Sequence, residues 1–113
     1  MASENELTNI TKLRGRENFH AWKFELKVHL EANGLMSYVN GSIKKPMYVE
    51  TKDGNNLNKV QNWEKKDAMS KKLIISTVEK SLLPHLMSCE TSSDMWKNIC
   101  KYSEAAEKSK NVH

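Results

Sequence analysis

The strongest structural signal in the chain is residues 17–33, with the sequence ENFHAWKFELKVHLEAN. Its large apolar side chains recur every three or four residues, at Phe19, Trp22, Leu26 and Leu30. At about 100° per residue these positions fall on one face of a helix. Asn33-Gly34 follows, and a glycine here readily takes the left-handed conformation that ends a helix. The segment predicts an amphipathic helix, with Asn18 as its candidate N-cap.

Two large apolar residues of this segment do not fit the stripe. Phe24 and Val28 fall on the opposite face, beside Lys27. A later segment or the tail of the same chain would cover them, or they form an exposed patch for another subunit. We take Phe24 and Val28 as the candidate self-association residues.

Three further helices are expected after residue 62. The first runs from Trp63 to about Lys80, with Asn62 as its cap. A short one follows Ser81 or Leu82, because Pro84 is tolerated only in a first turn. The last begins at residues 91–94, TSSD, which fit the capping-box pattern.

Residues 35–62 are expected to form a long polar loop. They contain the turn pairs Asn40-Gly41 and Asp53-Gly54, and Pro46 blocks a helix. A short hairpin around Asp53-Gly54 is conceivable. A loop of this length is uncommon in a compact domain, which indicates a functional or mobile segment.

These patterns predict an all-α fold, a small bundle of about four helices with a long polar loop after the first. Residues 1–11 are expected to be a flexible tail, and residues 12–113 the helical domain. We expect the three tryptophans to anchor one core, because burying a large aromatic side chain contributes about 2–3 kcal/mol. The expected core residues are Phe19, Trp22, Leu26, Leu30, Trp63, Ile74, Trp96 and Ile99.

No constellation in the sequence suggests catalysis. The four histidines have no metal-site spacing, and although His85 and Cys89 stand four residues apart, two ligands do not hold a structural zinc. We therefore expect no enzyme activity, no metal, no cofactor and no small-molecule substrate. Two cysteines are too few for a disulfide scaffold. The polar N-terminus has no secretory signal and no apolar run could span a membrane, so we expect a cytoplasmic protein.

The net charge of +4 is a mild bias that permits weak contact with phosphate. Phe19 and Trp22 lie on the inward stripe, which argues against a surface on which bases would stack. The candidate RNA-contact residues are Arg14, Arg16, Lys23, Lys27, Lys65 and Lys66.

Two blocks of residues together resemble the Gag polyprotein of copia-type LTR retrotransposons. The first block is Leu13, Gly15, Asn18, Phe19, Trp22 and Lys23, continuing to Gly34-Leu35. The second is Trp63, Ile74, Leu83, His85-Leu86, Cys89, Thr91, Asp94-Met95-Trp96, Ile99 and Tyr102. Two spacings depart by one residue from the family pattern, and the resemblance covers about residues 12–110.

The resemblance implies the N-terminal part of a capsid-like helical domain, incomplete at its C-terminus. Such domains self-associate into particles around the element's RNA. We therefore expect a structural module whose partners are further copies of itself or other Gag chains, and weakly RNA. The alternatives are a weak nucleic-acid-binding module and the nonfunctional product of a truncated element.

Overall fold

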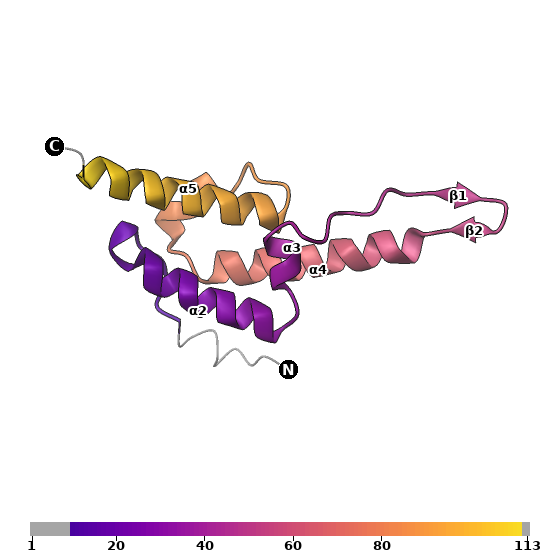
Figure 1. Cartoon of the computed structure of the whole chain (residues 1–113), viewed down its shortest axis with the longest axis horizontal. Helices are drawn as coiled ribbons and strands as arrows, with labels where there is room; N and C mark the ends of the chain where they lie inside the picture. The colour runs from indigo at the N-terminus through magenta and orange to yellow at the C-terminus, as the bar shows by residue number, and fades with distance from the viewer. Residues whose placement is uncertain (1–9, 112–113) are drawn as a thin grey trace.

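The computed structural model describes residues 10–111 of the chain, and the side chains of residues 10–102. Helical segments dominate it, and the longest ones pack side by side (Figure 1). The helical elements are η1 (Arg16–Asn18), α2 (Phe19–Ala32), α3 (Met36–Val39), α4 (Leu57–Ser76), η2 (Lys80–His85) and α5 (Ser92–Asn111).

The fold is mainly helical but not strictly all-α. Strands β1 (Glu50–Thr51) and β2 (Gly54–Asn55) pair antiparallel, with Glu50 opposite Asn55. Lys52 and Asp53 form the turn between them, and Gly54, the first residue of β2, has a φ of 130°, which residues other than glycine rarely adopt. The hairpin considered from the sequence is present, and the expectation of a purely helical fold is correct only in part.

Helix α2 ends as the sequence predicts. Gly34 has a φ of 70°. The Leu35 N–H donates to the Leu30 carbonyl at 2.8 Å, and the Gly34 N–H to the Glu31 carbonyl at 3.1 Å. These two bonds are the Schellman arrangement, which satisfies carbonyls at the helix end.

The start of α2 differs from the expectation. Asn18 precedes the helix, but its side chain does not cap it. The Asn18 Oδ1 accepts a hydrogen bond from the Arg14 N–H, and its Nδ2 donates to the Lys12 carbonyl. Asn18 therefore holds the incoming chain rather than the helix terminus.

Helix α4 begins at Leu57, not at Trp63, and Asn62 is not its cap. Its buried side chains recur at helical spacing along the whole length: Val60, Trp63, Asp67, Ser70 and Ile74. Two of these five, Asp67 and Ser70, are polar, so the apolar stripe is weak in the sequence.

The C-terminal end of α4 is also earlier than expected, at Ser76. The next residues leave the helix to pair with the segment before α2. The Leu13 N–H donates to the Thr77 carbonyl at 2.8 Å, and the Glu79 N–H to the Leu13 carbonyl at 2.9 Å. This long-range bridge replaces the last helical turn that the local pattern predicts.

The short helix after α4 is a 3₁₀ helix from Lys80 to His85. Pro84 is its fifth residue and not part of a first turn, which corrects the expectation. Helix α3, another short helix, lies inside the segment expected to be loop.

All eight residues expected in the core are buried, but they do not form one cluster. The Trp22 ring packs against Trp96, with centroids 5.7 Å apart, and its Nε1 donates to Thr77 Oγ1. Trp63 lies outside this cluster; its ring faces Tyr38, and its Nε1 donates to the Ile43 carbonyl at 2.8 Å. The expectation that three tryptophans anchor one core is therefore corrected to two.

The packed part of the chain begins before residue 12. Ile10 is buried and joins the main cluster beside Leu13. Residues 1–9 of the expected tail lie outside the described residues.

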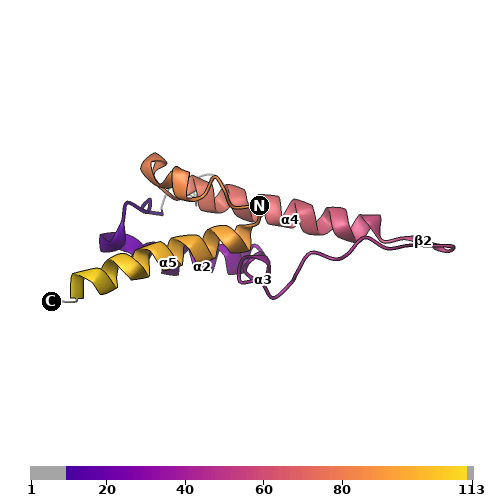
Figure 2. The same ribbon diagram turned by 90° about the horizontal axis from the view of Figure 1, so that it is seen from above.

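The molecule is elongated, with extents of 63 × 34 × 21 Å. The N-terminal half of α4 and the β1–β2 hairpin project beyond the other helices, as Figures 1 and 2 both show. This projection leaves the hairpin far from the main cluster.

Candidate functional site

The outward face of α2 carries the two residues considered for self-association. Phe24 is 69% exposed and Val28 is 47% exposed. Phe19, Trp22, Leu26 and Leu30 occupy the opposite, buried face of this helix. No segment among residues 10–102 covers Phe24 and Val28. The tail, which is the other cover considered, falls mostly in residues 1–9, outside the described part of the chain.

The six basic residues considered for RNA contact lie on two separate parts of the fold. Arg14 and Arg16 stand in and before η1, Lys23 and Lys27 on α2, and Lys65 and Lys66 on α4. Lys23 and Lys66 are half-buried, whereas the other four are exposed. The structure therefore offers scattered positive charge and not one continuous basic groove.

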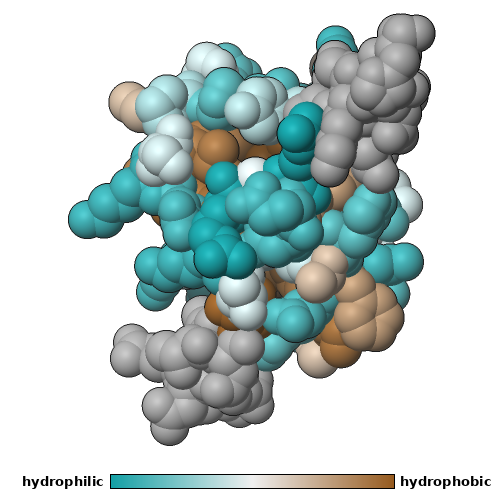
Figure 3. All heavy atoms as spheres, turned by 90° about the vertical axis from the view of Figure 1, so that its left-hand side faces the viewer, coloured by the Kyte–Doolittle hydropathy of each residue, from teal (hydrophilic) through white to brown (hydrophobic). Residues whose placement is uncertain are grey.

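Two of the three aromatic residues near these charges, Phe19 and Trp22, are not available to stack bases, whereas Phe24 is exposed. Phe19 and Trp22 are buried, and the Lys23 ammonium lies over the Phe19 ring, 5.7 Å from its centroid. A stacking platform needs rings whose faces reach solvent. Figure 3 shows one end of the molecule, where hydrophilic side chains dominate and hydrophobic atoms form small patches between them.

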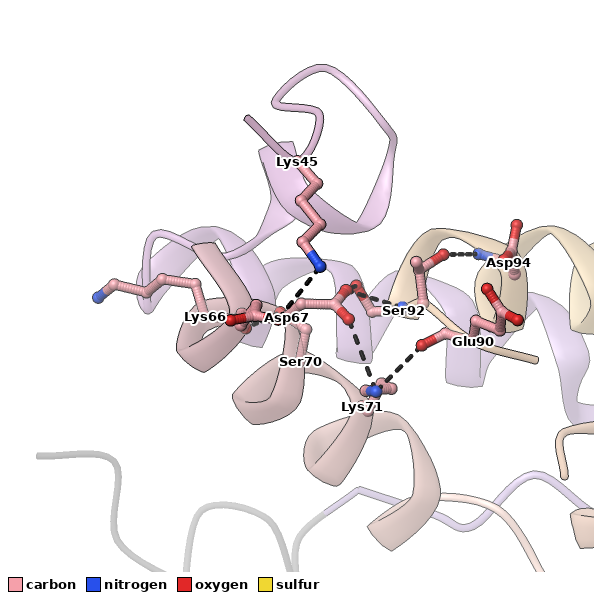
Figure 4. Close-up of polar contacts among 10 residues, drawn as sticks. Lys45, Lys66, Asp67, Ser70, Lys71, Glu90, Ser92 and Asp94 are labelled. Atoms are coloured by element: carbon pink, nitrogen blue, oxygen red, sulfur yellow. Dashed lines mark hydrogen bonds and ion pairs between the residues drawn. The ribbon is translucent and has the colours of Figure 1, made fainter. Parts of the chain in front are cut away.

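A buried carboxylate joins α4 to the start of α5. Asp67 is 4% exposed, and its Oδ1 accepts hydrogen bonds from the Ser92 N–H at 2.9 Å and the Ser92 Oγ at 2.7 Å (Figure 4). The Lys71 Nζ lies 3.7 Å from Asp67 Oδ2 and donates to the Glu90 carbonyl. A negative charge at a helix N-terminus is stabilised by the helix dipole and the free N–H groups. Asp67 thus fixes where α5 begins.

The sequence reasoning missed Asp67. A polar residue in the register of Val60, Trp63 and Ile74 is the sequence signal that points to a buried polar partner. The capping motif at residues 91–94 was recognised, and the Asp94 N–H does donate to Thr91 Oγ1 at 3.1 Å. What the motif could not show is that a second helix supplies a further acceptor to Ser92.

His85 and Cys89 take part in ordinary packing contacts. The His85 ring lies against Tyr102, with centroids 4.5 Å apart, and the Cys89 thiol approaches the His85 carbonyl at 3.9 Å. Among the described residues, no three His, Cys, Asp or Glu side chains gather as metal ligands would. No described helix has the length and apolar content needed to cross a membrane.

Residues 26–113 match the family model described as gag-polypeptide of LTR copia-type. The chain belongs to the copia-type gag family. The match covers more than half of the chain and includes α4, η2 and α5. It begins at Leu26, so the first half of α2 and the part of the first motif from Leu13 to Lys23 lie before it. No curated protein and no solved structure matches the chain significantly.

Membership of the copia-type gag family bears on how the exposed apolar faces of the fold are interpreted. A gag polypeptide is a structural, non-catalytic component of its element, and it interacts in general with other gag chains or with nucleic acid. An exposed apolar surface, which would favour aggregation on an isolated domain, is therefore a candidate site of contact with another chain here.

Proposed function

We propose that this chain is a structural module of a gag polypeptide and assembles, without catalysis, by packing the outward face of α2 against a second copy. The observation that carries the proposal is the exposure of Phe24, which is 69%, on a helix of a gag-family chain. Burying a phenylalanine side chain contributes about 2–3 kcal/mol, and an isologous contact buries two of them.

The residues around Phe24 and Val28 suit a helix–helix contact. Ala21 and Ala32 are exposed and lie on the same face, where their small side chains allow two backbones to approach closely. Lys27 and Glu31, also exposed, border the face with opposite charges. Two copies of the face can therefore meet with apolar residues at the centre and charges at the rim.

Replacing Phe24 with aspartate tests the proposal. Because the side chain is exposed, Phe24→Asp should leave the helical circular-dichroism signal unchanged while lowering the mass of the species heavier than the monomer in size-exclusion chromatography with light scattering. Met69→Asp, at a 43% exposed residue of α4, is the matched control and should keep those species. An oligomer mass that Phe24→Asp leaves unchanged would refute the α2 contact.

Weak contact with RNA is a second proposed role, supported by the exposure of Arg14, Arg16, Lys27 and Lys65. Because such binding releases counterions from phosphates, affinity for a short RNA should fall steeply with salt, whereas a flat response would remove this role. We also propose a cytoplasmic location, which is consistent with the absence of a disulfide at Cys89 and Cys100 in the described part of the chain.

A further inference from the structure

An open apolar groove lies between the C-terminal half of α4 and the segment that links η2 to α5. Its volume is about 680 Å³. Its apolar lining includes Ile75, Leu83, Leu86, Met87 and Met95. Met87 is 80% exposed and Ile75 41%, so these two side chains meet solvent, whereas Leu86 and Met95 are buried. The charged residues that line it are two lysines, Lys71 and Lys72.

A second apolar feature lies at the other end of α4. We call residues 47–55 the arm, which consists of residues 47–49 and the β1–β2 hairpin. Met47, Tyr48 and Val49 are three consecutive exposed residues, and Met47 is 84% exposed. The arm's charged residues are Glu50, Lys52 and Asp53, which give it a net negative charge.

The arm keeps its extended form through one side chain. Asn56 Oδ1 accepts from the Val49 N–H at 2.8 Å, and Asn56 Nδ2 donates to the Met47 carbonyl at 2.7 Å. The Asn56 N–H also donates to the Val49 carbonyl. These bonds hold the apolar segment beside the start of α4, so that little entropy is lost when it binds.

The arm cannot reach the groove of its own chain. It leaves from the N-terminal end of α4 and points away from the other helices (Figures 1 and 2). The groove is lined by residues 68–76 of the same helix, and the helix between them is continuous. A contact between the two features therefore needs two molecules.

We propose that the arm of one copy docks into the groove of a second copy. Met47 and Val49, on one side of an extended segment, would enter the apolar lining, and the carboxylates of Glu50 and Asp53 would approach Lys71 and Lys72. Lys72 is exposed and forms no ion pair within the described residues. Each copy has one arm and one groove, so the contact is heterologous and extends into a ring or an open chain.

This head-to-tail contact rests on the proposed self-association but uses a surface separate from Phe24 and Val28. The two contacts together would link copies in two directions. An assembly built from several weak contacts gains strength from their number.

The native thiol of Cys89 lines the groove and allows a direct test. In a Cys100→Ser background, Met47→Cys places a thiol on the arm. A mild oxidant, copper phenanthroline, should then produce a ladder of disulfide-linked species on non-reducing electrophoresis. The linked fraction should be several-fold larger than with Asn58→Cys, which exposes a thiol beside the arm but outside it.

Two further variants test whether the groove is the surface that the arm contacts. Cys89→Ser should abolish the ladder, and Lys72→Glu should reduce the linked fraction about two- to fivefold, with recovery when Glu50→Lys is added. Linking that persists in Cys89→Ser would mean that two arms meet each other, and this would overturn the proposal. So would a yield no higher than that of Asn58→Cys.

The α2 contact is tested separately by adding Phe24→Asp to the Met47→Cys variant. The ladder should persist, because the arm and the groove are unchanged. If Phe24→Asp leaves the oligomer mass of the otherwise native chain unchanged while the ladder forms, only the α2 contact fails. If the mass falls and no ladder forms, only the arm contact fails.

Discussion

Among the residues that the structure describes, Asp67 is the one charged residue that is buried. It is buried in α4, and one of its oxygens satisfies both the N–H and the hydroxyl of Ser92. Removing a buried acceptor leaves its donors without partners, which costs more than the hydrogen bonds themselves contribute.

Asp67→Ala should therefore lower the free energy of unfolding by about 2–3 kcal/mol, and Asp67→Asn by about 1 kcal/mol, because the amide oxygen still accepts hydrogen bonds. Urea unfolding followed by circular dichroism measures both values. Asp94→Ala is the matched control, since this exposed acid in the first turn of α5 should cost at most about 0.5 kcal/mol. Equal costs for Asp67→Ala and Asp94→Ala would contradict the role given to Asp67.

Single residues also show what the sequence could reveal. The end of α2 is predictable because Gly34 alone can adopt the required φ, and its effect is local. The prediction of Asn18 as a capping side chain is wrong, because its partners, Arg14 and Lys12, depend on how the incoming chain folds back. The burial of Asp67 depends on a residue 25 positions away, so no local pattern could identify its partner.

At the scale of elements, α2 and α5 were predictable and α4 was predictable only in part. The apolar stripe of α2 is continuous, and the capping motif of α5 is explicit. The first turns of α4 are polar and carry only Val60 as a buried residue before Trp63, so the sequence gives little sign of them. The end of α4 is decided by pairing with Leu13, which is tertiary and not visible in a local pattern.

The arm is the element whose conformation depends most on one residue. Asn56→Ala removes the two side-chain bonds to Met47 and Val49 but leaves the main cluster untouched. We expect faster amide hydrogen exchange at residues 47–55, with a change in the free energy of global unfolding below about 0.5 kcal/mol.

Asn55→Ala is the comparison for this prediction. The Asn55 side chain accepts a hydrogen bond from the Leu57 N–H and makes no bond to the segment Met47–Val49. Asn55→Ala should therefore leave amide hydrogen exchange at Met47 and Val49 close to that of the unaltered chain. Unchanged exchange across the arm in Asn56→Ala would show that other contacts hold it.

At the scale of the whole molecule, the described part of the chain has three apolar regions that its own core does not bury. Phe24 and Val28 face outward on α2, the arm presents Met47–Val49, and the groove along α4 is open. Phe24 and Val28 could be predicted from the sequence, because they lie on the opposite face of a helix with a clear apolar stripe. The arm and the groove could not be predicted, because each is formed by segments whose conformation the sequence does not determine.

The central claim is that this gag-family chain associates with itself. Sedimentation velocity of the unaltered chain over a series of concentrations tests the claim most directly. We predict that the mass rises with concentration above the 13.0 kDa of one chain. A mass that stays at one chain throughout the series, in a sample whose circular dichroism shows the helices formed, would contradict the account.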